Sequence, residues 1–128
     1  NILVSALIVD GKPRDLLNVI IAKNHKLIFS RKIIEEFVKV TAEPRIQKYV
    51  TKQEVTRFLQ DLAAVSKLIH VRSKLGVVRD QHDNPILATA YDGHGRYLVT
   101  GDDDLLALRK FKGVKIMKVS EMLKILEQ

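Results

Sequence analysis

The chain contains no cysteine among its 128 residues, which excludes disulfide bonds, thiolate metal sites and cysteine nucleophiles. It also lacks any run of eighteen apolar residues and any segment that resembles a signal peptide. We therefore expect a soluble, cytoplasmic protein with no membrane partner. Internal repeats and Gly/Ser-rich linkers are absent as well, and the length suits one hydrophobic core. The sequence predicts a single domain over residues 1–128.

The charge of the chain is strongly basic, with a formal net charge of +7 and a pI near 9.7. Such a charge suits a polyanionic partner, because basic side chains displace counterions from a phosphate backbone. A lysine-rich surface of a heat-adapted protein is the alternative reading. Basic residues are spread over the expected helices, whereas acidic residues gather at 35–36, 80–83 and 102–104. This distribution favours a nuclease that holds a metal against phosphate over a passive binder.

Short apolar runs alternate with helical patterns along the chain. The expected strands lie at 26–29, 68–71, 96–100 and 114–119. The expected helices run over 13–23, from Ser30 to Glu43, over 52–66, over 85–93, over 105–109 and from Ser120 onward, with Ser30, Thr51, Asp83 and Ser120 as N-caps. Strands with few polar positions between helices predict a three-layer α/β/α fold with a central parallel sheet.

Three carboxylates follow Gly101 directly, at Asp102, Asp103 and Asp104. Carboxylates packed this closely repel one another unless a cation neutralises them, although one or two of them are also explained as helix-capping acids. Right-handed crossovers bring the carboxyl ends of parallel strands to one edge, which also gathers Glu36 and Asp83. Oxygen ligands without histidine or cysteine suit Mg2+ or Mn2+. The sequence thus predicts a metal site at this edge.

Four segments together carry a family resemblance: 1–7, 30–37, 79–90 and 97–106. In this order and spacing they resemble the PIN domain, with the nearest likeness to toxin components of prokaryotic toxin-antitoxin pairs. The resemblance spans essentially the whole chain. It implies a metal-dependent ribonuclease that uses Mg2+ or Mn2+, with RNA and a cognate antitoxin as partners.

The resemblance also assigns residues. Carried over by position, the metal ligands are Glu36, Asp83, Asp102 and Asp104, and Thr100 matches a small hydroxyl residue before the last acids. Asn1 corresponds to an asparagine placed to orient the attacking water or a carboxylate. The family's first strand and its catalytic aspartate would precede Asn1, so we expect them in a longer chain, with a degenerate family member as the alternative.

Other residues near these positions have weaker claims. Glu35 is the alternative ligand to Glu36, but it points about a hundred degrees away around the helix. We expect Asp80 in a turn, Asp103 as a helix-start acid and His82 at the surface. The amphipathic helix over 52–66 is expected in the core, with a homodimer contact as its alternative.

Two other classes of function remain open at the level of sequence. One is a non-catalytic PIN-like domain that binds nucleic acid. The other is a metal-dependent phosphatase or receiver domain, which also gathers acids at the edge of a parallel sheet. That class needs an aspartate nucleophile on a strand and a Lys or Thr/Ser partner, and Thr100 fits it only loosely.

Overall fold

The structure is a computed structural model that describes residues 2–76 and 84–127. Its helices are α1 (Ile2–Ile8), α2 (Lys12–Ala22), α3 (Arg31–Thr41), α4 (Pro44–Gln47), α5 (Lys52–Ala63), α6 (Asn84–Asp92), α7 (Asp103–Leu108) and α8 (Val119–Leu126). Its strands are β1 (Leu27–Ser30), β2 (Ser66–Ile69), β3 (Tyr97–Val99), β4 (Lys110–Phe111) and β5 (Val114–Met117). Within the described ranges, every helix is too short or too polar to span a bilayer.

The strands form two small sheets. In the first, β1 pairs with β2 in parallel, with Leu27 beside Ser66 and Ser30 beside Ile69. In the second, β5 lies between β3, which is parallel to it, and β4, which is antiparallel. Parallel pairing confirms the expected sheet, but the antiparallel β4 was not predicted. Over residues 2–76 and 84–127, no strand pairs with the second edge of β1 or with the second edge of β3.

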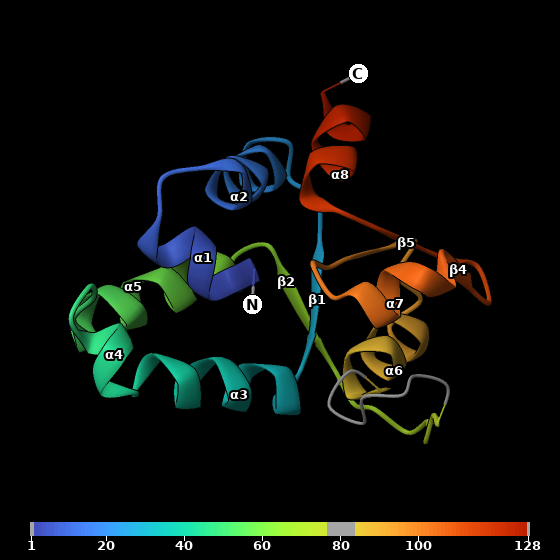
Figure 1. The fold of residues 1–128 in the computed structure, drawn as a ribbon, viewed down its shortest axis with the longest axis horizontal. Coiled ribbons are helices and arrows are strands. Elements are labelled where there is room, and N and C mark those ends of the chain that lie inside the picture. The colour runs from blue at the N-terminus through green and yellow to red at the C-terminus, as the bar shows by residue number, and fades with distance from the viewer. Residues whose placement is uncertain (1, 77–83, 128) are drawn as a thin grey trace.

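Helices cover both sides of the strands, as Figure 1 shows. Helices α1, α3, α4 and α5 lie on one side of β1 and β2, and α6 and α7 lie on the other. Helices α2 and α8 pack against each other near the start of β1. The three-layer α/β/α fold expected from the sequence is confirmed.

The apolar faces of the helices form the core. The largest cluster joins α2 and α8, through Leu16, Leu17, Met122 and Leu123, to Phe29 of β1. A second cluster surrounds Phe37 of α3, whose ring stacks on that of Phe58 at 5.7 Å between centroids. The expected core position of the helix over 52–66 is therefore confirmed for its apolar side.

Helix α6 connects the two sheets, because it contacts β1, β3 and α3. The chain after α6 lies close to β1 at Gly93. A Cβ atom at this glycine would lie 2.5 Å from Cγ2 of Ile28 and 2.9 Å from the carbonyl oxygen of Thr89. Only a residue without a side chain fits there, so Gly93 sets how closely the end of α6 approaches β1.

The predicted helix starts have mixed outcomes. The capping box of α5 is confirmed, since Thr51 Oγ1 accepts from the Glu54 amide at 3.1 Å and Glu54 Oε1 accepts from the Thr51 amide at 3.0 Å. The cap predicted at Ser120 is wrong, because α8 begins after Lys118, whose amide donates to Glu121 Oε1. Strand β2 begins at Ser66, two residues before the predicted start.

Candidate metal centre

Asp102 lies between β3 and α7, as the N-cap residue of α7. Its carboxylate Oδ2 accepts from the Leu105 amide at 2.9 Å, and its own amide donates to Thr100 Oγ1 at 3.0 Å. The capping alternative therefore holds for this residue. A carboxylate has about four lone-pair positions, so one capping bond leaves acceptor capacity for a cation. The capping bond fixes the orientation of the Asp102 carboxylate and leaves lone pairs on it for a cation.

The other two acids of the run differ from each other in exposure. Asp104 is partly buried, as Asp102 is, whereas Asp103 is exposed. Both lie in the first turn of α7, where their charge also suits the helix dipole. Asp103 therefore lies where a helix-start acid is expected, at an exposed position in the first turn of α7.

Glu36 and Glu35 lie side by side in α3 but have different surroundings. The Glu35 carboxylate pairs with Arg31 at 2.9 Å, and both side chains are exposed. No ion pair involves Glu36 in the part of the chain that the structure describes, although helical spacing puts Lys32 and Lys39 on its face. Both glutamates are exposed, so the choice of Glu36 as the ligand stays a prediction.

Asp83 and Asn1 lie outside the described residues, as do Asp80 and His82. The chain position of Asp83 is nevertheless informative, because it directly precedes α6, the helix that contacts β1, β3 and α3. Asp83 is therefore one residue from the element that connects the halves of the sheet.

The predicted ligands do not form a complete metal site in the described ranges. Across residues 2–76 and 84–127, no three His, Asp or Glu side chains lie close enough together to hold a metal ion. The donor set itself is chemically suitable, since Glu36, Asp102 and Asp104 offer only carboxylate oxygens, which Mg2+ and Mn2+ prefer. Metal binding by these residues stays a prediction.

The sequence patterns missed two polar contacts of α6. The Thr89 hydroxyl donates to Ser30 Oγ at 2.8 Å, with both side chains buried. The Asp92 carboxylate accepts from Ser73 Oγ at 2.5 Å and from the Ser73 and Arg72 amides at 2.8 and 2.7 Å. These bonds, above all those from Ser73, hold the pKa of Asp92 below its usual value.

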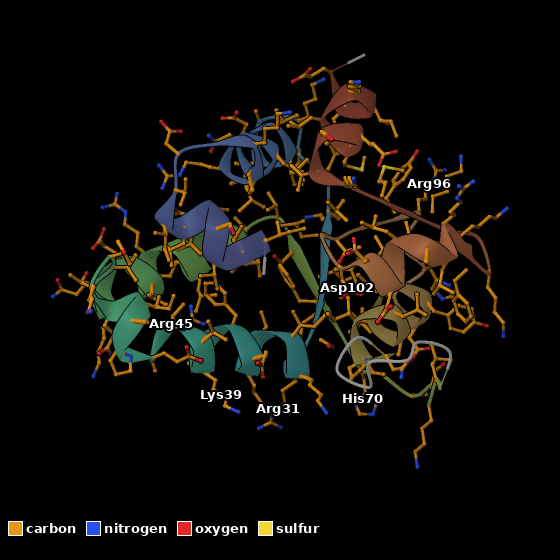
Figure 2. All side chains as sticks on the ribbon, in the orientation of Figure 1. Arg31, Lys39, Arg45, His70, Arg96 and Asp102 are labelled. Atoms are coloured by element: carbon orange, nitrogen blue, oxygen red, sulfur yellow. The ribbon has the colours of Figure 1, made fainter. Side chains whose placement is uncertain are left out.

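Figure 2 shows basic side chains on the outer side of α3, where Arg31 and Lys39 point away from the helix. Asp102 lies toward the other side of β1, beside α7. Metal-assisted phosphate chemistry requires carboxylates that hold the ion and basic groups that position the phosphate, and Figure 2 shows the two kinds of group on different sides of β1.

Comparison with known proteins identifies the family of the chain. The family model of the PIN domain matches residues 1–104, and the chain belongs to this family. PIN domains are generally nucleases and typically use divalent metal ions. The chain is 30% identical over 111 residues to the uncharacterized protein MJ1680 of Methanocaldococcus jannaschii, covering 85% of this chain and 71% of that protein. No solved structure matches the chain.

Proposed function

We propose that this PIN domain is a metal-dependent endoribonuclease that hydrolyses RNA phosphodiester bonds, and that it is the toxin of a toxin-antitoxin pair. The observation that carries the proposal is the Asp102 carboxylate, held by its cap at the carboxyl end of β3 with acceptor capacity left. Asp104, Glu36 and Asp83 are the further ligands of the proposed site. A bound Mg2+ or Mn2+ would supply a water of lowered pKa and positive charge for the phosphate.

The residues of this chain have separate roles in the proposed reaction. Thr100 and the Leu105 amide fix Asp102, so its carboxylate is oriented before any ligand arrives. Lys32 and Lys39 flank Glu36 and offer positive charge to the RNA backbone. Asn1 is proposed to orient the attacking water.

The decisive comparison is between Asp102→Asn and Asp103→Asn. Asparagine caps a helix about as well as aspartate, so Asp102→Asn keeps the bond to Leu105 and removes only the charge. We expect this variant to lose Mg2+- or Mn2+-dependent cleavage of labelled RNA while it unfolds at an unchanged denaturant concentration. Asp103→Asn makes the same change at the exposed neighbour and should cleave normally. Equal activity of the two variants would contradict the assignment of Asp102.

Asp83→Asn tests the ligand that lies outside the described residues. We expect it to lose cleavage with folding intact or improved, because a repulsive carboxylate is removed. Full activity in this variant would remove Asp83 from the site.

A non-catalytic PIN-like domain that binds nucleic acid is the second candidate. It is supported by the net charge of +7, which suits binding to a phosphate backbone. Assays of RNA binding and RNA cleavage in Mg2+, Mn2+ and EDTA separate the two candidates. A small phosphate ester in the same assays tests the phosphatase alternative, which predicts its hydrolysis in preference to RNA.

The proposed partners need tests of their own. A toxin should arrest growth when expressed alone, and co-expression of its cognate antitoxin should restore growth. The inactive Asp102→Asn variant should not arrest growth. A homodimer is checked by measuring the molecular mass in solution.

A further inference from the structure

The outer edge of β2 has no strand partner in the described ranges, since β2 pairs only with β1 there. The Leu27 amide donates to the carbonyl of Val65 at 2.8 Å, and backbone groups that face the neighbouring strand alternate along a parallel pair. By this alternation, Lys67 bonds toward β1, and the amide and carbonyl of Leu68 face outward. Leu68 therefore offers one donor and one acceptor to an added strand.

The Leu68 side chain is uncovered although its neighbour is part of the core. Leu68 lies beside Phe29 in the register of β1 and β2, so the two side chains share one side of the sheet. Phe29 is 8% exposed, whereas Leu68 is 70% exposed. The helices that bury Phe29 do not reach Leu68, and an apolar side chain stands next to an open backbone edge.

Charge on β2 and on the segment that follows it has one sign. Between residues 66 and 76, the charged side chains are Lys67, Arg72 and Lys74, with His70 between them, and all four are exposed. Figure 2 shows His70 at the end of β2. The Asp92 carboxylate reaches this segment from α6, where it is engaged with the Arg72 and Ser73 amides. The segment itself contains no acidic residue.

We propose that the outer edge of β2 binds an extended acidic segment of a partner protein, which adds to the sheet as a strand beside β2. Main-chain bonds to Leu68 supply affinity, as in other cases of strand addition, and alternate side chains supply specificity. An apolar residue of the partner covers Leu68, and its carboxylates face Lys67, Arg72 and Lys74. Pairing of β2 with a second copy is disfavoured, since each copy has a net charge of +7 and no acidic residue between 66 and 76.

The test uses a fluorescent peptide of alternating valine and glutamate with the full chain. We expect its anisotropy to rise on binding, the affinity to fall with added salt, and the Leu68 amide to exchange with solvent about tenfold more slowly in the complex. The same peptide N-methylated at every residue keeps every charge and side chain but loses its donors along both edges. It should not bind, and equal binding of this peptide would overturn the proposal.

Matched charge reversals locate the surface. Lys67→Glu with Lys74→Glu should weaken binding about tenfold or more, whereas Lys48→Glu with Lys52→Glu, the same change at two exposed positions after α4, should not change it. Equal loss in both cases, unchanged exchange at Leu68, a dimer that already protects Leu68, or displacement of the peptide by RNA would each overturn strand addition. None of these measurements depends on RNA cleavage, so their failure is distinct from failure of the proposed nuclease.

Discussion

The hydroxyl of Thr89 in α6 donates a hydrogen bond of 2.8 Å to the hydroxyl of Ser30, at the junction of β1 and α3. The two side chains are 2% and 3% exposed, so water does not replace the bond if one partner is removed. Thr89 Oγ1 also lies 2.7 Å from the carbonyl oxygen of Pro85, one turn earlier in α6. This contact connects the helix that follows Asp83 to the start of the helix that carries Glu36.

Thr89→Val should destabilise the chain by about 1–3 kcal/mol, because the shape is kept while the buried Ser30 hydroxyl loses its partner. Denaturant unfolding measures the effect. Thr89→Ser keeps the hydroxyl and should fall between wild type and Thr89→Val. If valine proved as stable as threonine, the hydroxyl pair would have no role in stability.

Acid should loosen the segment that Asp92 holds. The pKa of Asp92 is lowered from 3.8, chiefly by the Ser73 hydroxyl, so the carboxylate stabilises the fold above its unfolded pKa. That contribution should begin to fall near about pH 5 and continue to fall until the pH is below the lowered pKa. Asp92→Asn should be less stable at neutral pH and converge with wild type in acid. A stability difference that does not change with pH would contradict this role.

Gly93→Ala should destabilise the chain by about 1–3 kcal/mol, because the new methyl group would collide with Ile28 and with the Thr89 carbonyl. Gly11→Ala is the matched control, since a Cβ there meets nothing within 4 Å. Thermal unfolding of both variants checks the prediction. A similar small change in both would show that β1 and α6 separate easily.

Basic residues beside Glu36 should make RNA binding dependent on salt. Lys32→Gln and Lys39→Gln should each weaken binding in EDTA and lower the slope of log K against log salt by about 0.7, the value for one contact to a single strand. Lys124→Gln, at an exposed position in α8, makes the same change elsewhere. An equal slope in all three variants would place the RNA on another surface.

Sequence patterns predicted the local features best. The capping box at Thr51 and Glu54 depends on residues three apart, and it is present as expected. Ser30 is the N-cap residue of α3 as predicted, yet it makes no capping bond within the described residues, because its hydroxyl pairs with Thr89, 59 positions away. A partner so distant in the sequence cannot be predicted from the residues around Ser30.

Strand β4 was missed because it has two residues and therefore no alternation to detect. The turn after it, with positive φ at Lys112 and Gly113, is the kind that joins antiparallel strands. The candidate site also has a part that the local sequence predicts and a part that it does not. The cap at Asp102 follows from its own segment, whereas the distance from Asp102 to Glu36 depends on how α3, α6 and β3 pack.

The two sheets share no ladder of hydrogen bonds in the described ranges, and α6 contacts both of them. Glu36 lies in α3, beside the sheet of β1 and β2, and Asp102 follows β3 of the other sheet. An ion bound by both residues would therefore link the two sheets. Each tenfold increase of Mg2+ or Mn2+ above its dissociation constant would then add about 1.4 kcal/mol to the stability of the joined form. Metal supply would in this way tune the rigidity of the protein as well as its chemistry.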